Sequence, residues 1–148
     1  MARACAEALR LAAEENQLQI QLELGPVNIL AESERLRLLM TNLLSNAIQY
    51  NRPAGQIRLQ TCAENGQALL RISDTGIGIA PEDLPHIFER FYRADKSRAG
   101  TNGHAGLGLA ICQAIVEADA GNITVSSQPG VGTTVTIRWL AINKPSEA

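Results

Sequence analysis

Polar residues recur at helical spacing near the middle of the chain. They fall at positions i, i+4, i+7 and i+8 and are Asn42, Asn46, Gln49 and Tyr50. At about 100° per residue they form one strip beside the apolar face of a predicted helix. A carboxamide supplies an oxygen ligand without adding negative charge, which suits a Mg²⁺ ion held by few protein groups and by phosphate oxygens. The alternative is a polar strip that only borders the core, next to a fully solvated face carrying Glu34, Thr41 and Ser45.

A carboxylate and two glycines follow directly on a predicted strand, in the segment Asp74-Thr75-Gly76-Ile77-Gly78-Ile79. Glycine lets a backbone come close to a flat ligand and adopt positive φ. A carboxylate at the strand end can accept a hydrogen bond from an exocyclic amino group such as that of adenine. The alternative is an ordinary glycine-rich turn.

Two further clusters suit phosphate. The first is the segment Gly103-His104-Ala105-Gly106-Leu107-Gly108-Leu109, which leads into a predicted helix whose N-terminal N–H groups and dipole favour an anion. It is neither a P-loop nor a dinucleotide-binding glycine motif, and a generic glycine-rich connection is the alternative. The second cluster consists of cations interleaved with aromatic residues, and these cations could reach phosphates. The alternative is a solvated loop. The cations are Arg90, Arg93, Lys96 and Arg98.

Composition limits the classes of protein. The chain has 148 residues, 45% hydrophobic and 19% charged, with a net charge of −2. This argues against a nucleic-acid binder that depends on bulk positive charge. Cys5, Cys62 and Cys112 are too widely spaced for a zinc motif. No stretch approaches the ~20 apolar residues of a membrane span, so we expect a soluble, cytoplasmic chain with no direct membrane insertion.

Hydrophobic periodicity predicts the elements that must position these groups. Apolar residues at i, i+3, i+4 and i+7 predict an amphipathic helix from an N-cap at Ser33 to the Arg52-Pro53-Ala54-Gly55 stop. Asn65-Gly66 predicts a hairpin turn. The other predicted elements are helices over 1–16, near 82–91 and over 107–120, and strands over 18–24, 27–30, 56–63, 67–73, 123–127 and 133–140. Together they predict one α+β domain over 1–148, a two-layer sandwich whose mixed, mostly antiparallel sheet is covered by helices on one face.

The order and spacing of these motifs resemble the ATP-binding catalytic domain of sensor histidine kinases, in the superfamily shared with gyrase, the Hsp90 chaperone and MutL. Residues 42–51 resemble the N box, 74–78 the G1 box, 87–93 the F box, 106–111 the G2 box and 130–133 the last glycine motif. The similarity covers roughly residues 10–140. Residues 93–98 also resemble, more weakly, the heavy-metal-sensor branch.

The resemblance implies a site for ATP and Mg²⁺ under a lid formed by residues 79–105. Asn46 would be the catalytic residue that ligates Mg²⁺, and Asp74 would accept from the adenine amino group. Thr133 would help to hold adenine through water, and backbone N–H groups at 106–108 would bind phosphates. The implied ATP-binding residues are Asn42, Asn46, Gln49, Tyr50, Asp74, Gly76, Gly78, Ile79, Arg93, His104, Ala105, Gly106, Leu107, Gly108, Leu109 and Thr133.

The chain departs from the family pattern at three positions. Gln49 stands where the family usually has Lys or Arg, so a phosphate-contacting cation is missing unless a lid cation replaces it. His104 replaces a glycine of the G2 box, and Asp119 stands where the family often has His. Relatives that hydrolyse ATP carry Glu where this chain has Asn42, which favours phosphoryl transfer because no base for water is evident.

The resemblance also implies partners. Neither His86 nor His104 resembles a phospho-acceptor. We therefore expect the acceptor histidine on a separate dimerisation domain of a parent kinase anchored in the inner or plasma membrane, with a response regulator downstream. The isolated chain is expected to be monomeric. Two interpretations stay open: a degenerate module that binds ATP weakly or only docks to a partner, and a serine kinase or small ATPase of the same fold.

Overall fold

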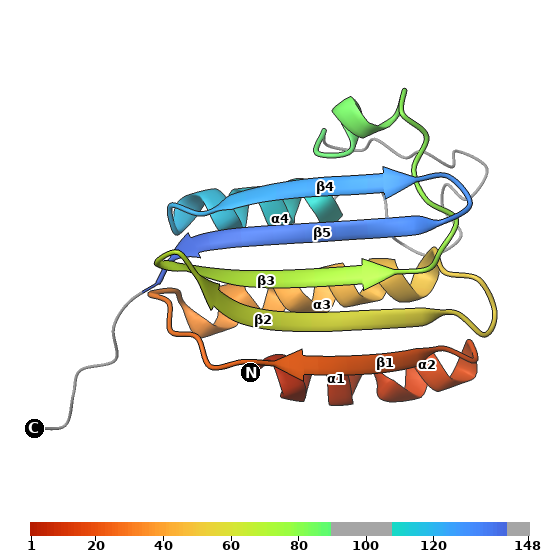
Figure 1. Ribbon diagram of the computed structural model, residues 1–148, viewed down its shortest axis with the longest axis horizontal. Coiled ribbons are helices and arrows are strands. Elements are labelled where there is room, and N and C mark those ends of the chain that lie inside the picture. Colours follow the sequence, from red (N-terminus) through yellow and green to blue (C-terminus); the bar gives the residue numbers. More distant parts are fainter. Residues whose placement is uncertain (90–107, 142–148) are drawn as a thin grey trace, which may run out of the picture.

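A twisted five-stranded sheet organises the computed structural model, which describes residues 1–89 and 108–141. The strand order is β1-β2-β3-β5-β4 (Figure 1). β1 runs parallel to β2, and the other neighbours are antiparallel. The strands are β1 (Gln19–Leu24), β2 (Gln56–Glu64), β3 (Gln67–Asp74), β4 (Asn122–Gln128) and β5 (Gly132–Leu140). The predicted mixed, mostly antiparallel sheet is confirmed.

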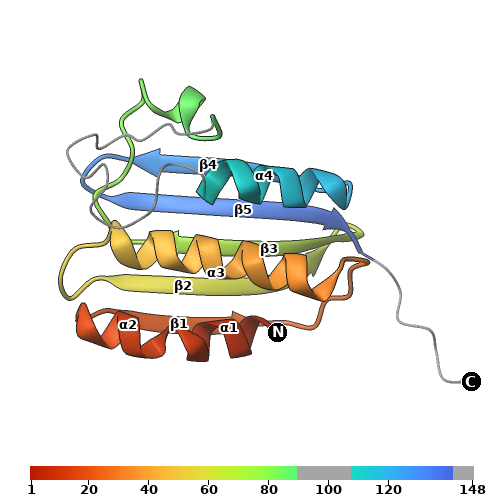
Figure 2. The same ribbon diagram turned by 180° about the vertical axis from the view of Figure 1, so that it is seen from behind.

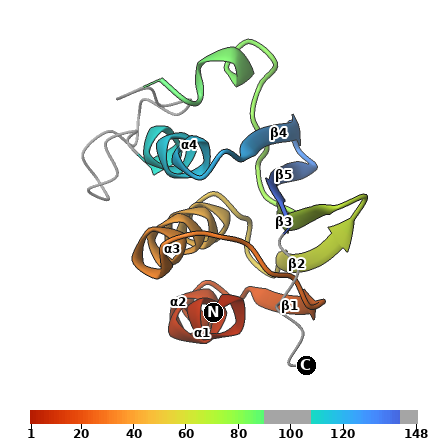
Figure 3. The same cartoon turned by 90° about the vertical axis from the view of Figure 1, so that its left-hand side faces the viewer.

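The helices lie on one face of this sheet (Figure 3). They are α1 (Ala2–Ala8), α2 (Arg10–Glu15), α3 (Ser33–Gln49) and α4 (Gly108–Ala118), with a short 3₁₀ helix, η1 (Leu84–His86), beyond the β4 edge. The predicted two-layer sandwich is therefore confirmed for the described residues. α3 connects β1 to β2, and this crossover is what allows those two strands to be parallel.

The core lies between the two layers. α3 buries a stripe of apolar side chains at helical spacing, as its periodicity predicts: Leu39, Met40, Leu43, Leu44, Ala47 and Ile48. This stripe packs on the inward-facing residues of the central strands, among them Ile57, Leu59, Leu70, Ile72 and Ile137. Each such side chain contributes roughly 1.5–3 kcal/mol through burial, so the sheet and α3 hold the frame on which the strand ends are mounted.

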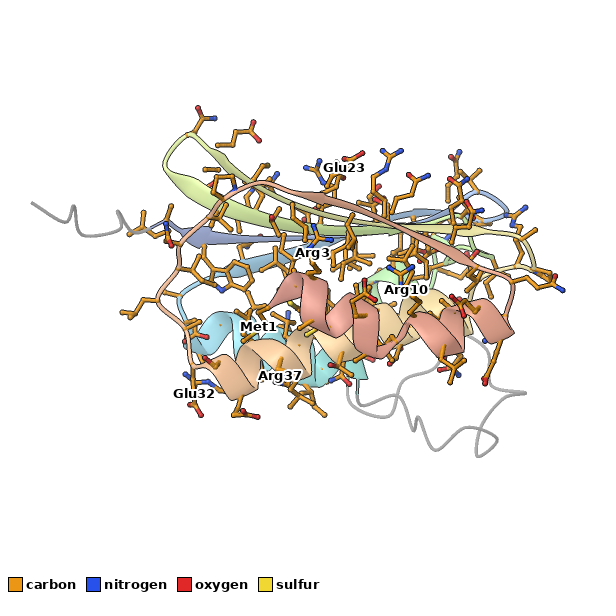
Figure 4. The ribbon with its side chains drawn as sticks, turned by 90° about the horizontal axis from the view of Figure 1, so that it is seen from below. Met1, Arg3, Arg10, Glu23, Glu32 and Arg37 are labelled. Carbon is orange, nitrogen blue, oxygen red and sulfur yellow. The ribbon has the colours of Figure 1, made fainter. Side chains whose placement is uncertain are left out.

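The other face of the sheet is polar. Side chains of β1 alternate between exposed and half-buried, as expected for a strand with one wet face. Figure 4 shows Glu23 on the side of the sheet away from the helices, whereas Glu32 and Arg37 lie on the outer side of the helix layer. No helix in the described parts of the chain is long and apolar enough to cross a bilayer.

The hairpin prediction is confirmed. Asn65 and Gly66 both have positive φ, 52° and 77°, as a type I′ turn requires. The amphipathic helix is confirmed too, although its N-cap is Glu32 rather than Ser33, which is the first helical residue. Strand and helix ends elsewhere agree with the predictions to within one or two residues.

Three predicted elements are wrong in part. The helix expected over 1–16 is interrupted at Leu9, where the N–H bonds to the carbonyl three residues earlier. No strand forms over 27–30, because the ladder with β2 ends where the Gly25 N–H bonds to the Thr61 carbonyl. Near 82–91 the described residues form turns and η1, since Pro85 cannot continue an α-helix.

α3 and α4 run antiparallel (Figure 2). An ion pair connects them at one end. Arg35, in the first turn of α3, donates to the Asp119 carboxylate just after α4 at 3.2 Å. The Asp119 side chain is only 10% exposed, whereas Arg35 is 44% exposed. Asp119 therefore has a structural partner at the end of the helix pair opposite to the site described below.

We expect the Arg35–Asp119 pair to contribute modestly to stability. A double-mutant cycle with Arg35→Ala and Asp119→Ala should give a coupling free energy of about 0.5–1 kcal/mol, because one partner is largely solvated. Urea unfolding measures it, and 1 M salt should reduce it. Arg37→Ala, on the same helix and exposed, is the control. A coupling of zero at low salt would show that the pair does not tie the helices.

Candidate functional site

Polar side chains replace the apolar rows of the sheet at one edge. Asp74 at the end of β3 pairs with Thr133 on β5, and Thr133 pairs with Ser127 on β4. Asp74 lies two and four residues after Ile72 and Leu70, which face the helices, so it faces them too. The register therefore brings Asp74, Thr133 and Ser127 into one transverse row under the helix layer.

The ends of two helices lie at the same edge (Figure 2). α3 arrives with its C-terminus, which carries Asn46, Gln49 and Tyr50, and α4 departs with its N-terminus at Gly108 and Leu109. The edge thus combines a carboxylate, a carboxamide strip and a helix N-terminus. A helix N-terminus favours an anion, so the two ends of the site have opposite electrostatic preferences.

The carboxamide strip faces α4. The Asn42 side chain hydrogen-bonds the thiol of Cys112, which is fully buried on α4. Burial raises the pKa of this thiol to about 12, with the Asn42 hydrogen bond acting in the opposite direction. Both polar atoms of the Gln49 carboxamide are buried as well. The strip lies beside the buried apolar face of α3, as the helical spacing predicts. Of the face predicted to be fully solvated, only Glu34 is exposed, while Thr41 and Ser45 are half-buried.

Asp74 is the chemically distinctive group. Burial raises the pKa of its carboxyl, and backbone N–H donors from Gly76 and Thr133 oppose that rise. The Gly76 N–H lies 2.8 Å from Asp74 Oδ1. Two donors occupy only part of a carboxylate's acceptor capacity. Asp74 can therefore accept further hydrogen bonds from a ligand amino group.

The glycines around Asp74 are required by the chain itself. A Cβ at Gly76 would collide with the Tyr50 carbonyl, and one at Gly78, where φ is 76°, with the Gln128 carbonyl. A Cβ at Gly132 would collide with the carbonyl of Asp74. Close backbone packing against neighbouring elements thus accounts for these glycines. Gly76 lies against the Asp74 carboxylate, whereas Gly78 lies against Gln128.

Ser127 was not anticipated from the sequence. Its Oγ accepts the Ile79 N–H at 2.7 Å and lies 2.8 Å from Thr133 Oγ1 and 3.0 Å from the Gly132 carbonyl oxygen. Ser127 thereby joins Ile79 to Thr133, two predicted site residues. Its signal in the sequence is a hydroxyl at the helix-facing position of a strand whose other such residues, Ile123 and Val125, are apolar.

Arg52 was also missed. The sequence pattern predicts only that it ends the helix, whereas its guanidinium donates to the carbonyl oxygens of Gly76 at 3.0 Å and Gly130 at 2.6 Å. The neighbouring Tyr50 contributes a main-chain contact, since its carbonyl accepts the Ile77 N–H at 3.1 Å. These bonds attach the loop after Asp74 to the end of α3.

Several predicted site residues lie outside the described residues. They are Arg93, His104, Ala105, Gly106 and Leu107, together with Arg90, Lys96 and Arg98 of the cationic cluster. Of the expected lid, residues 79–89 are described, and there His86 Nδ1 lies 3.0 Å from Glu89. Within the described residues no cluster of three or more acidic, His or Cys side chains could hold a metal. A neutral oxygen such as that of Asn46, half-buried at the open end of α3, fits an ion that keeps most of its ligands as water and phosphate.

Comparisons with known proteins agree with this arrangement. Residues 31–143 match the family described as histidine kinase-, DNA gyrase B-, and HSP90-like ATPases. The chain is 41% identical over 128 residues to the sensor histidine kinase RppB of Synechocystis sp., covering 86% of this chain and 28% of that protein. It is 42% identical over 125 residues to the sensor histidine kinase YkoH of Bacillus subtilis, covering 83% and 27%. The chain thus spans a little over a quarter of the length of these relatives.

Solved structures show the same fold. Full-length ShkA in complex with AMPPNP superposes with a TM-score of 0.83 at 30% identity, covering 97% of this chain and 30% of that one. The mycobacterial sensor histidine kinase MprB gives a TM-score of 0.81 at 27% identity and covers 97% of both chains. With an edge row of Asp74, Thr133 and Ser127 and a family match over most of its length, the chain belongs to the histidine kinase-, DNA gyrase B- and HSP90-like ATPase family.

Proposed function

We propose that this chain is the ATP-binding catalytic domain of a sensor histidine kinase. It binds Mg-ATP and supplies the γ-phosphoryl group to a histidine on a separate dimerisation domain, with a response regulator downstream. The observation that carries the proposal is Asp74, a half-buried carboxylate with unused acceptor capacity, placed beside Thr133 at the edge where α4 begins. The relatives named as sensor histidine kinases, and the AMPPNP complex of ShkA, support the same assignment.

The site divides into a base half and a phosphate half. Asp74 accepts a hydrogen bond from the exocyclic amino group of adenine. The Thr133 hydroxyl, which is hydrogen-bonded to Ser127, faces the same side of the adenine ring. Guanine presents a carbonyl where adenine has the amino group, so it would meet the Asp74 carboxylate with an acceptor. The N-terminus of α4 at Gly108 binds phosphate oxygens through its N–H groups.

Asn46, in the last turn of α3, would hold Mg²⁺ through its carboxamide oxygen. When bound, Mg²⁺ neutralises charge on the phosphate oxygens. In the transfer, a bond forms between an imidazole nitrogen of the acceptor and the γ-phosphorus while the bond to the bridging oxygen breaks, and ADP leaves. The chain's own residues act by positioning ATP and by supporting charge.

The competing function of a small ATPase needs a base for the attacking water. One turn before Asn46, this chain carries Asn42, whose carboxamide is hydrogen-bonded to the thiol of Cys112. A neutral amide cannot take a proton from water. An amide in place of a carboxylate at position 42 therefore favours phosphoryl transfer to a protein over autonomous hydrolysis. The parent kinase is proposed to be membrane-anchored, with this domain in the cytoplasm and monomeric when isolated.

Calorimetric titration with AMPPNP tests nucleotide binding. We expect micromolar to low-millimolar affinity, weaker binding of GMPPNP, and a loss of about 10- to 100-fold in Asp74→Asn, since a hydrogen bond to a charged group contributes about 1.5–3 kcal/mol. The affinity of Asn46→Ala for AMPPNP should not depend on Mg²⁺. It should equal the affinity of the wild type measured without Mg²⁺. Glu64→Gln, a carboxylate-to-amide change at the far end of β2, is the matched control. Failure of the wild type to bind at millimolar AMPPNP would refute the proposal and favour a docking module.

Thermal unfolding tests whether Asp74→Asn still folds, so that its loss of nucleotide binding is not caused by unfolding. Burial raises the pKa of Asp74 above its ordinary value of 3.8. The unfolded chain therefore ionises this carboxyl at lower pH than the folded chain, and Asp74 costs stability as pH rises from its unfolded pKa through its folded pKa. Asp74→Asn removes this cost, so its melting temperature relative to wild type should increase from pH 3 towards neutral. If Asp74→Asn instead becomes less stable relative to the wild type as pH rises, the pKa of the Asp74 carboxyl is not raised in the folded chain.

Phosphoryl transfer distinguishes the kinase from its rivals. The chain is mixed with a separately prepared histidine-bearing dimerisation domain of a sensor histidine kinase and [γ-³²P]ATP. We expect acid-labile, base-stable label on that domain, lost in Asn46→Ala and retained in Glu64→Gln. Free phosphate released without label on the acceptor would indicate an ATPase, and label on serine a serine kinase.

A further inference from the structure

Arg52 joins two loops that are 54 residues apart in sequence. It lies three residues after the end of α3, and one nitrogen of its guanidinium, Nη2, donates to both the Gly76 carbonyl at 3.0 Å and the Gly130 carbonyl at 2.6 Å. Gly76 belongs to the loop after β3, and Gly130 to the turn between β4 and β5. A terminal guanidinium nitrogen such as Nη2 carries two N–H groups, so it can donate to two carbonyl oxygens at once.

Main-chain bonds close this contact into a ring. The Gly130 N–H donates to the Ile77 carbonyl at 2.9 Å, and the Ile77 N–H donates to the Tyr50 carbonyl at 3.1 Å. The Gly76–Ile77 peptide is therefore held on both sides, by Arg52 at its carbonyl and by Tyr50 at its N–H. Arg52 is the side-chain member of a ring that otherwise consists of backbone.

The ring borders the two groups assigned to the base. Gly76 donates its N–H to Asp74 Oδ1 at 2.8 Å, and the turn that contains Gly130 leads within three residues to Thr133. Fixing the Gly76 and Gly130 carbonyls therefore restricts how far the loop of Asp74 can separate from the strand of Thr133. Arg52 itself is exposed, so the core does not depend on it.

We propose that Arg52 is a positioning residue for the base half of the nucleotide site. It holds the loop after Asp74 and the β4–β5 turn at the spacing that a flat base needs, before the nucleotide arrives. This inference rests on the proposed function. Its alternative is that Arg52 turns to the phosphates and replaces the cation that is missing at Gln49.

The two roles differ in how a loss of affinity depends on the nucleotide. If Arg52 positions the loops, its loss weakens the binding of every ligand that carries the base by the same factor. The free-energy cost of ordering the loops does not depend on the number of phosphates. A phosphate contact weakens binding more as phosphates are added, and high salt reduces the difference. AMP, ADP and AMPPNP share the base and differ in phosphate count, so they separate the two.

The experiment measures Kd for these three nucleotides with wild type, Arg52→Gln and Arg52→Lys. We expect a loss of about three- to ten-fold, equal across the three nucleotides and unchanged by salt. Arg52→Lys should be as weak as Arg52→Gln, since an ammonium does not reproduce the planar geometry. Arg58→Gln, an exposed arginine on the polar face of the sheet, is the control. Melting temperature and Trp139 emission verify the fold.

Amide spectra of the nucleotide-free variants supply a readout that does not depend on binding. Loss of the Arg52 bonds should shift the amides of Ile77 and Val131, which follow the two carbonyls, and leave β1 and α2 unchanged. A loss that grows from AMP to AMPPNP, or one that Arg52→Lys rescues, overturns the positioning role. Unchanged affinities overturn it as well. If the wild type binds none of the three, the proposed function fails, and unshifted amides would show separately that the ring is not held by Arg52.

Discussion

A half-buried carboxylate is the constraint on which the rest of this structure depends. Asp74 lies at the end of β3 under the helix layer, where burial raises its pKa and disfavours its charge. The chain offsets that cost with two backbone donors, from Gly76 and Thr133. One of these requires a tight loop directly after the strand and the other requires a neighbouring strand in fixed register. The glycines, the β3–β5 pairing and the contacts of Arg52 all serve that geometry.

Local patterns were sufficient for the frame and for part of the site. The α3 periodicity, the Asn65-Gly66 turn and the alternation of β1 each depend on neighbours within one element, so they could be predicted from the sequence. Asp74 was a candidate because a carboxylate followed by two glycines comes directly after a predicted strand, although this local pattern also fits an ordinary glycine-rich turn. Order along the chain then separated this family from other glycine-rich nucleotide binders.

Long-range partners could not be predicted in the same way. Ser127 belongs to the site only because β4 pairs with β5 and β5 with β3, a strand order that no local pattern encodes. Arg52 gives no signal beyond its place after a helix, since its partners lie 24 and 78 residues away. The strand expected over 27–30 is wrong for a related reason: its residues have β propensity, but the ladder that would pair them has ended.

The helix pair joins the two elements proposed to bind the phosphates and Mg²⁺, and it does so through side chains that carry little charge. Asn42 on α3 forms a hydrogen bond with the Cys112 thiol, which lies one turn after the start of α4. This contact places the first turn of α4 next to the turn of α3 that precedes Asn46. Because Cys112 is fully buried and its pKa is about 12, this thiol stays neutral and suits a neutral partner. A carboxylate at position 42 would place a charge against that buried contact at a desolvation cost. A carboxamide at position 42 therefore suits this neutral contact between α3 and α4, and it is also a residue type that cannot serve as a base for water.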